Sequence, residues 1–180
     1  MPGTLQTIKG TLWYSLPYLW HWKKDLLLLE QSKSVQHLSS INVRDEWATP
    51  KNRFDYVVEN YNVTPLLDVC ATFLNRKCAL FHSKQDSGLE RNWVHTFWMN
   101  PPYSEISTWM KYAYEQHLKH NVTGVALIYS KTDTRYWHDY VEGKAEVHFI
   151  KGRIKFLDEF GKQSKNSAPY PSCYVIWRSK

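Results

Sequence analysis

Short apolar runs alternate with amphipathic segments from residue 45 onward, and this alternation restricts the possible folds more than any other feature. The apolar runs are typical of buried strands, at 66–71, 79–83, 96–99, 122–129, 146–151 and 173–178. Apolar residues at helical spacing predict three helices: 50–61, a segment capped by Ser104, and one capped by Thr132 or Asp133. Strands that alternate with helices predict an α/β fold, a mostly parallel sheet flanked by helices.

Two features of this pattern bear on topology and ligand binding. The strands 146–151 and 173–178 are separated by a polar, basic loop without a helix, which predicts a terminal antiparallel strand pair. Ligands of parallel sheets bind beyond the carboxyl ends of the strands. We therefore expect the ligand-binding loops to be those after Ala71, Ser83, Met99 and Tyr129.

Residues 1–43 differ from the rest of the chain. Five aromatic residues crowd between Trp13 and Trp22, and a polar stretch follows from Gln31 to Ser40. We predict two parts: an aromatic-rich N-terminal extension and linker over 1–43, and a folded domain over 44–180.

The start of the first helix carries a recognisable signal. Thr49 is a residue type that favours the N-cap, and Pro50 is suited to the first helical position.

Three tryptophans farther along the chain, Trp93, Trp98 and Trp109, are predicted to belong to the core.

Composition limits the functional classes. The formal charge of +6 is compatible with a polyanionic partner. Cys70, Cys78 and Cys173 lack metal-ligand spacing, so we expect free thiols in a reducing compartment and no metal site. No apolar run reaches the roughly 18 residues of a membrane span. These observations predict an intracellular, cytoplasmic protein without a membrane partner.

Asn100, Pro101, Pro102 and Tyr103 form the motif with the clearest chemistry. They follow a predicted buried strand and precede a helix, where an α/β fold places its ligands. Two consecutive prolines fix the backbone and offer carbonyls without N–H groups. The Asn side chain adds an acceptor, and the tyrosine adds an aromatic ring. This rigid set of acceptors suits a planar NH2 group on an aromatic base.

Such a group is a poor nucleophile, because its lone pair is delocalised into the ring. Acceptors that draw both N–H groups out of the base plane favour a pyramidal, nucleophilic amine. A sulfonium methyl group held in line could then be transferred. The motif therefore predicts methylation of an exocyclic amine.

The sequence resembles the phage-type DNA N6-adenine methyltransferase (Dam) family over about residues 45–178. The matching motifs are Asp45-Glu46-Trp47-Ala48-Thr49-Pro50, Leu66 to Thr72 with Asn75 and Cys78, Gly88-Leu89 with Trp93, Asn100 to Tyr103 with Trp109, Thr132-Asp133-Thr134 with Trp137, Lys151 to Phe156, and Ser167-Ala168-Pro169. The resemblance implies a Rossmann-like class I methyltransferase fold and S-adenosylmethionine as cofactor. It also implies catalysis by Asn100, Pro101, Pro102 and Tyr103 on a flipped-out adenine.

The resemblance further implies a set of cofactor-binding residues: Trp47, Thr49, Pro50, Asp68, Ala71 and Asp86. Thr49, Pro50 and Asp68 would lie near the methionine end of the cofactor. The family commonly has an acid directly before Gly-Leu, whereas this chain has Ser87 there and its acid at Asp86. The role of binding the ribose or adenine is therefore assigned to Asp86.

Double-stranded DNA is the expected partner. Phosphate contacts supply much of the affinity of such enzymes, and the basic loop offers five cations for them: Lys151, Arg153, Lys155, Lys162 and Lys165. The resemblance to phage proteins implies a modification role in the cytoplasm of a host cell.

Other interpretations of the same motif are open. Asn-Pro-Pro-Tyr also serves enzymes that methylate RNA bases or protein glutamine, although these usually carry a Gly-rich stretch after the first strand. Enzymes that methylate the cytosine amine more often have Ser at the first motif position. A non-catalytic nucleic-acid-binding relative is the remaining alternative.

Overall fold

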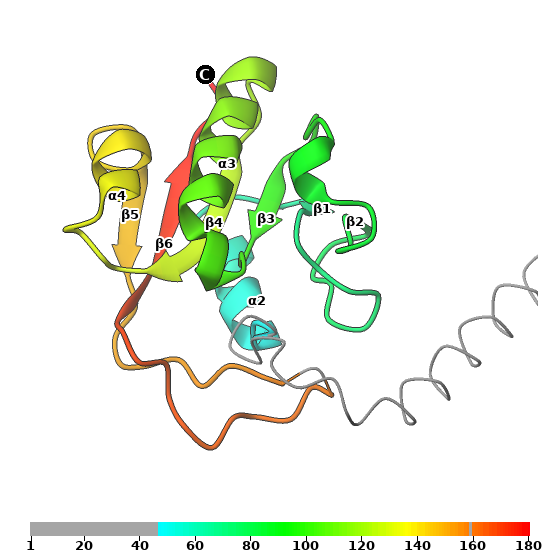
Figure 1. Cartoon of the computed structure of the whole chain (residues 1–180), viewed down its shortest axis with the longest axis vertical. Coiled ribbons are helices and arrows are strands. Elements are labelled where there is room, and N and C mark those ends of the chain that lie inside the picture. The colour runs from blue at the N-terminus through cyan, green and yellow to red at the C-terminus, as the bar shows by residue number, and fades with distance from the viewer. Residues whose placement is uncertain (1–46, 159) are drawn as a thin grey trace, which may run out of the picture. The chain divides into compact units, whose positions relative to one another are not determined.

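The structure, a computed structural model, describes residues 47–158 and 160–180. Figure 1 shows the elements, which in chain order are α2 (Lys51–Asn60), β1 (Leu67–Asp68), β2 (Leu80–Phe81), η1 (Gly88–Glu90), β3 (Phe97–Met99), η2 (Tyr103–Glu105), α3 (Ile106–His120), β4 (Gly124–Tyr129), α4 (Arg135–Tyr140), β5 (Glu146–Phe149) and β6 (Ser172–Trp177). The predicted extension over 1–43 lies outside the described residues. Within the described ranges, no helix has the length and apolar character needed to cross a membrane.

Among the described residues, six strands form one sheet in the order β2-β1-β3-β4-β6-β5. The strands β2, β1, β3 and β4 are parallel to one another. Strand β6 lies between β4 and β5 and runs antiparallel to both. The mixed α/β architecture predicted from the sequence is confirmed.

The strands β1, β3, β4 and β6 are buried along their whole length, so both faces of the sheet are covered there, since successive residues of a strand point to opposite sides. On one side, Ala126 and Ile128 of β4 belong to a core cluster that includes buried residues of α3 and α4. On the other side, Val125 and Leu127 join a cluster with Val57 of α2. Helices therefore cover both faces, with α3 and α4 on one and α2 on the other (Figure 1).

The second cluster also includes part of the loop between β5 and β6. Ile154 and Phe156 are each only 1% exposed and pack with Val57 and Tyr174. Lys155 lies between these two anchors in the sequence and is exposed. The basic loop is therefore fastened to the core at alternate positions, and the cation between them faces solvent.

Gly124 allows β4 to approach β3 closely. A Cβ atom at this position would lie 2.0 Å from the ring of Phe97, its partner in the parallel register. Phe97 is completely buried, so its ring cannot swing into solvent. A side chain at position 124 would therefore require β3 and β4 to separate.

The Gly-Leu motif has a structural role. A Cβ at Gly88 would lie 2.3 Å from the backbone oxygen of Val69, so only glycine fits. The indole N–H of Trp93 donates to the carbonyl of Gly88 at 2.8 Å, and the Trp93 ring lies near Trp109. Trp93, Trp98 and Trp109 are all buried, which confirms their prediction as core residues.

Helix starts are the main correction to the predicted elements. The N-cap of α2 is Pro50 and no side chain caps it, so the prediction of Thr49 as cap is wrong. The 3-10 turn η2 precedes α3, whose N-cap is Glu105 and not Ser104. The last helix, α4, has Thr134 at its N-cap, because residues 132–134 still form a turn.

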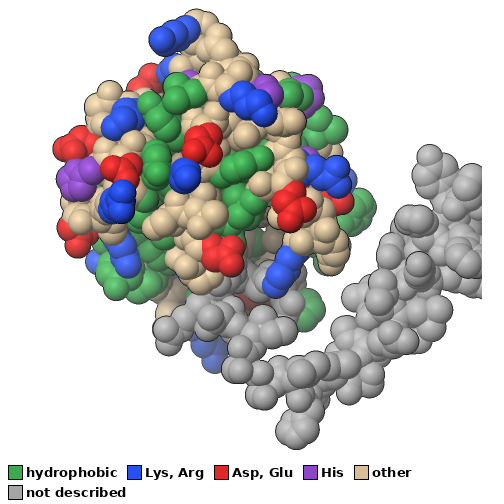
Figure 2. Space-filling view, turned by 45° about the horizontal axis from the view of Figure 1, so that its top comes forward, with side chains coloured by type: hydrophobic (Ala, Val, Ile, Leu, Met, Phe, Trp, Pro, Cys, Tyr) green, Lys and Arg blue, Asp and Glu red, His purple; other side chains and the backbone are tan. Residues whose placement is uncertain are grey.

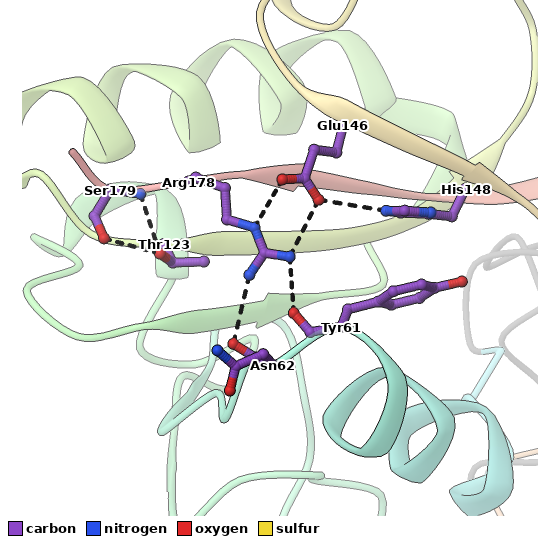
Figure 3. Close-up of polar contacts among 7 residues, drawn as sticks. All are labelled: Tyr61, Asn62, Thr123, Glu146, His148, Arg178 and Ser179. Carbon is purple, nitrogen blue, oxygen red and sulfur yellow. Dashed lines mark hydrogen bonds and ion pairs between the residues drawn. The ribbon is translucent and has the colours of Figure 1, made fainter.

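Arg178 joins three parts of the fold, as Figure 3 shows. Its guanidinium donates to both carboxylate oxygens of Glu146 on β5, at 2.9 and 3.1 Å. It also donates to the backbone oxygen of Tyr61, at the end of α2, at 2.7 Å. The Tyr61 ring stacks on His148 with ring centroids 4.0 Å apart. The end of β6 is thereby tied to α2 and β5.

Candidate active site

The strand order reverses between β1 and β3. The chain passes from β1 outward to β2 and then returns to β3 on the other side of β1. Such a switch point opens a crevice beyond the carboxyl ends of the two strands. Asp68 is the last residue of β1, and its register partner Trp98 lies two residues before Asn100. The fold therefore brings Asp68 and the Asn-Pro-Pro-Tyr motif to one place.

Asn100 is held in one orientation by a backbone carbonyl. Its side-chain nitrogen donates to the oxygen of Trp47 at 2.7 Å. The side-chain oxygen of Asn100 is enclosed and accepts no hydrogen bond. Leaving a buried acceptor unpaired typically costs about 1–3 kcal/mol. This site therefore holds an oriented acceptor that a donor group can satisfy.

The two prolines differ in their surroundings. Pro101 is buried, whereas Pro102 is half-buried and leads into η2. The carbonyl of Pro102 accepts the backbone N–H of Glu105 at 3.2 Å, which closes the 3-10 turn. The turn fixes the backbone that links Asn100 to Tyr103.

Tyr103 is half-buried, and its ring is stacked on that of Tyr129. Its ring lies parallel to that of Tyr129 at 3.8 Å, with an interplanar angle of 10°. Its hydroxyl is enclosed without a partner, and burial raises the pKa of that hydroxyl well above its ordinary value. The ring of Tyr129 also contacts that of Tyr170 in a tilted arrangement, with centroids 5.5 Å apart, and the ammonium of Lys131 lies 4.0 Å from the Tyr170 ring. The sequence prediction missed this aromatic support, because only Tyr103 belongs to the motif.

Asp68 is a buried carboxyl, 3% exposed. It accepts the backbone N–H of Lys77 at 2.9 Å and that of Cys70 at 3.5 Å. Burial outweighs these hydrogen bonds and raises the pKa of Asp68 to about 6. The Lys77 contact also fixes the loop between β1 and β2. Asp68 thus holds the loop between β1 and β2, and it places a buried, ionisable carboxyl group at the switch point.

Cys70 lies against the motif, which sequence reasoning did not foresee. The backbone N–H of Asn100 donates to its thiol. Burial raises the pKa of this thiol well above its usual range. Cys70 therefore lies against the Asn100 backbone as a neutral thiol.

Thr49 lies close to the Trp47 segment that holds Asn100. It is 3% exposed, and its hydroxyl oxygen is enclosed without a hydrogen-bond partner. Trp47 itself packs edge-on against Phe156. Pro50 follows at the start of α2 and is half-buried. The unpaired Thr49 hydroxyl is a second polar group available to a ligand.

Ala71 follows β1 in the chain, and Asp86 follows β2. Ala71 is buried, and its backbone N–H donates to the oxygen of His82 at 3.0 Å. Asp86 is exposed, accepts from Ser83 at 3.3 Å and lies 3.8 Å from Arg91. The imidazole Nε2 of His82 is enclosed without a partner, and burial lowers the pKa of His82. His82 had no recognisable spacing signal in the sequence.

The five predicted DNA-contact residues all lie exposed in the loop between β5 and β6: Lys151, Arg153, Lys155, Lys162 and Lys165. None of them forms an ion pair with a carboxylate of the described residues. Arg153 bonds the backbone oxygens of Ala168 and Pro169. On the face drawn in Figure 2, by contrast, Lys and Arg side chains are interspersed with Asp and Glu.

Residues 36–180 match the family model described as DNA N-6-adenine-methyltransferase (Dam). The chain belongs to the Dam family. The resemblance predicted from its motifs is confirmed. A DNA N-6-adenine-methyltransferase of Haemophilus phage HP1 is 30% identical over 139 residues, which is 76% of this chain and 80% of the phage protein. A protein of the same name from Escherichia phage T1 is 32% identical over 114 residues, 62% of this chain and 47% of the T1 protein.

Membership in the Dam family agrees with the activity predicted from the sequence, methylation of adenine N6 in DNA. The chain spans about half the length of the T1 relative.

Proposed function

We propose that this chain transfers the methyl group of S-adenosylmethionine to the N6 amine of an adenine flipped out of duplex DNA. One observation carries the proposal. The Asn100 amide is fastened through its nitrogen to Trp47, so that its enclosed oxygen has no partner. A bound adenine amine would supply the missing donor.

Asn100 and the carbonyl of Pro101 would each accept one N–H of the adenine amine. The Asn100 side chain is held by its bond to Trp47, and the Pro101 carbonyl belongs to a backbone fixed by the prolines and by the η2 turn, so both need little rearrangement as the amine becomes pyramidal. Pro102 would hold that turn in place. The removal of one such preorganised contact typically lowers the rate by about 100-fold to 1000-fold. No general base is required, because the proton can leave after transfer.

Tyr103 would stack on the flipped adenine. Tyr129 covers one face of its ring in the structure, so the base would take the opposite face. Stacking of one base on an aromatic side chain is worth about 1–3 kcal/mol in other systems. This gain would offset part of the free energy needed to extrude the base.

The buried polar groups at the switch point fit a cofactor with hydroxyl and ammonium donors. We assign the methionine end to Trp47, Thr49, Pro50 and Asp68, where an unpaired hydroxyl and a buried carboxyl lie. Ala71 would line the crevice. S-adenosylmethionine supplies an electrophilic methyl group when bound.

Asp86 is our proposed contact to the ribose or adenine of the cofactor. His82 is a further candidate for that end, because its Nε2 is enclosed without a partner. The Nε2 of His82 has no hydrogen-bond partner that a cofactor would have to displace, whereas Asp86 already forms an ion pair with Arg91.

We assign DNA contact to the basic loop: Lys151, Arg153, Lys155, Lys162 and Lys165. Their exposure and the lack of acidic partners among the described residues leave their charges free for phosphates.

The four parallel strands, helices on both faces and the switch point support a Rossmann-like class I arrangement with an antiparallel pair at its end. The phage relatives support a modification role for viral DNA.

The test is methyl transfer from radiolabelled S-adenosylmethionine to unmethylated duplex DNA, followed by mass spectrometry of the nucleosides. RNA and a protein lysate serve as parallel acceptors. N6-methyladenine from DNA, and a loss of about 100-fold in Asn100→Ala, is the expected result. Label in RNA or protein alone, or undiminished activity of Asn100→Ala, would overturn the proposal.

A further inference from the structure

Lys131 lies two residues beyond the end of β4, at the same edge of the sheet as the Asn100 motif. Its ammonium lies 4.0 Å from the centre of the Tyr170 ring, and no carboxylate of the described residues forms an ion pair with it. We propose that Lys131, held by Tyr170, binds a backbone phosphate of the target strand directly beside the adenine that is methylated. The inference rests on the proposed function and adds to it a phosphate site at the rim of the active site.

The backbone of Lys131 is fixed by hydrogen bonds on both sides. Its N–H donates to the oxygen of Tyr129 at 2.8 Å, and its carbonyl accepts the hydroxyl of Thr134 at 2.7 Å. The N–H of the preceding Ser130 donates to the oxygen of Pro171 at 2.9 Å. The turn after β4 is therefore joined to the end of the loop between β5 and β6, and the Lys131 side chain starts from a defined position.

Tyr170 restricts the Lys131 ammonium without neutralising it. The face of an aromatic ring attracts a cation, and the charge stays available to a second, anionic partner. Tyr170 is 46% exposed, so a ligand in solution can reach the ring and the ammonium that lies on it. A free lysine side chain loses much rotamer freedom when it binds, and a lysine already held on a ring loses less.

A row of rings connects Lys131 to the catalytic motif. Tyr170 contacts Tyr129 with ring centroids 5.5 Å apart, and Tyr129 stacks on Tyr103 at 3.8 Å. In the proposed complex the adenine takes the opposite face of Tyr103, so three rings separate the base from the ammonium. Lys131 is therefore placed for the strand that carries the base and not for the edge of the base. Of the groups in that strand, the phosphates carry the negative charge.

Arg153 connects this site to the basic loop. Its guanidinium bonds the backbone oxygens of Ala168 and Pro169, which directly precede Tyr170 in the chain. Lys131 and Arg153 thus hold neighbouring parts of one short segment, and neither has a carboxylate partner among the described residues. The cations of the basic loop are thereby continued to the rim of the active site, as a path for a phosphate backbone requires.

The charge of Lys131 is not compensated by the acids around it. Asp133, the nearest acid in the sequence, is exposed and forms no ion pair with Lys131 within the described part of the chain. It contributes instead, after burial, to the raised pKa of Tyr136. Arg91, by contrast, lies 3.8 Å from Asp86. Lys131 therefore combines a fixed position with a charge that an anion can use.

Lys144 offers a matched control. Its ammonium donates to the backbone oxygen of His138 at 3.0 Å, and no described carboxylate forms an ion pair with it. Lys144 precedes β5, which runs in the same direction as β4, since both are antiparallel to β6. It therefore lies at the edge of the sheet opposite to the active site.

The first experiment measures binding of duplex DNA by fluorescence anisotropy over a range of salt concentrations, with S-adenosylhomocysteine present. Lys131→Gln should reduce the slope of log K against log salt concentration by about 0.9, the value for one phosphate. Lys131→Arg keeps the charge and should keep the slope, and Lys144→Gln should match the wild type. An unchanged slope in Lys131→Gln would overturn the phosphate site.

The second experiment locates the phosphate. Duplexes that contain the adenine methylated by the wild type each carry one uncharged methylphosphonate, placed in turn along the target strand. One of the two phosphates that flank this adenine should matter: its replacement should weaken binding by the wild type about tenfold or more, and binding by Lys131→Gln by less than about twofold. Tyr170→Leu should lower the sensitivity at the same position, whereas Tyr170→Phe keeps the ring and should retain it.

The outcomes separate this site from the proposed function. Equal losses in the wild type and Lys131→Gln at every position would overturn the site, and so would a Lys131-dependent loss that falls away from the methylated adenine. A wild type whose salt slope depends on Lys131 but which methylates no adenine in DNA would overturn the proposed function and retain Lys131 as a phosphate-binding residue.

Discussion

The side-chain nitrogen of Asn100 donates to the backbone carbonyl of Trp47 at 2.7 Å, which joins residues 53 positions apart in the sequence. Asn100→Asp keeps the size of the side chain but replaces the donor with an acceptor that faces this carbonyl. We expect kcat to fall by about 100-fold or more, with little change in affinity for S-adenosylhomocysteine. Single-turnover kinetics and calorimetry measure the two quantities.

The same substitution at an exposed asparagine, Asn92→Asp, is the control, and it should leave kcat unchanged. An Asn100→Asp protein as active as the wild type would show that the orientation of this amide has no part in the reaction.

Tyr129 is expected to position Tyr103 through the stack of their rings. Aromatic pairs contribute about 0.5–1.5 kcal/mol beyond the burial of area, which corresponds to roughly threefold to tenfold in rate. Tyr129→Leu should lower kcat/KM for DNA by that factor, whereas Tyr129→Phe keeps the stack and should remain near the wild type. Equal kcat/KM values for the Leu and Phe variants would refute the positioning role.

Asp68 gives folding a specific pH dependence. Its pKa in the folded protein is raised from 3.8 to about 6, so the folded state binds the proton more tightly than the unfolded state. The contribution of Asp68 to stability is therefore greatest below about pH 4, falls as pH rises to about 6, and is constant above that. At about 1.4 kcal/mol per pKa unit, the change is on the order of 3 kcal/mol.

Other carboxyl groups also contribute to the pH dependence of stability, so the effect of Asp68 is measured as a difference between two proteins. The free energy of unfolding in urea is compared between the wild type and Asp68→Asn from pH 4 to pH 7. The wild type should lose stability relative to the variant as pH rises. A difference that is constant over this range would exclude the raised pKa.

Gly124→Ala places a methyl group against the Phe97 ring. Overpacking of a core typically costs about 1–3 kcal/mol, and we expect the upper part of that range because both strands are buried. Thermal and urea denaturation measure the loss. In Phe97→Leu the smaller side chain makes room, so adding Gly124→Ala to it should cost clearly less than adding it to the wild type. Additive effects of the two substitutions would contradict the close approach.

The basic loop predicts a salt dependence of DNA binding. The slope of log K against log salt concentration changes by about 0.9 for each phosphate of duplex DNA that a variant no longer neutralises. Lys151→Ala and Lys162→Ala should each reduce the slope by about that amount. Lys111→Ala is the control, because Lys111 is paired with Glu115 on α3. An unchanged slope in both loop variants would place the phosphate-binding cations elsewhere.

The sequence predicts the framework of this protein better than its details. Alternating apolar runs are enough to indicate the mixed sheet, and the position of Asn100 after a buried run is a local signal. The predicted helix caps are misplaced because Thr49 and Ser104 have the right chemistry, while a proline and a 3-10 turn decide where the helices begin.

The contacts that complete the site could not be predicted in this way. The Trp47 carbonyl carries no sequence signal, since every residue has one. In the sequence, Tyr129 is one more apolar residue at the end of a buried strand, and its stack on Tyr103 depends on the packing of β4 against η2. His82 and Cys70 likewise gain their meaning only from what encloses them.

The place of β6 between β4 and β5 has a consequence for how the molecule is made. While the chain is synthesised, β5 has no neighbour to pair with until β6 leaves the ribosome, and the edge of β4 stays open for as long. Non-local pairing of this kind makes folding slow and leaves a nascent sheet exposed to association. The loop that carries the basic residues is tethered by β5 and β6 at its two ends. Insertion of β6 therefore completes the sheet and fixes in one event the loop that we propose to contact DNA.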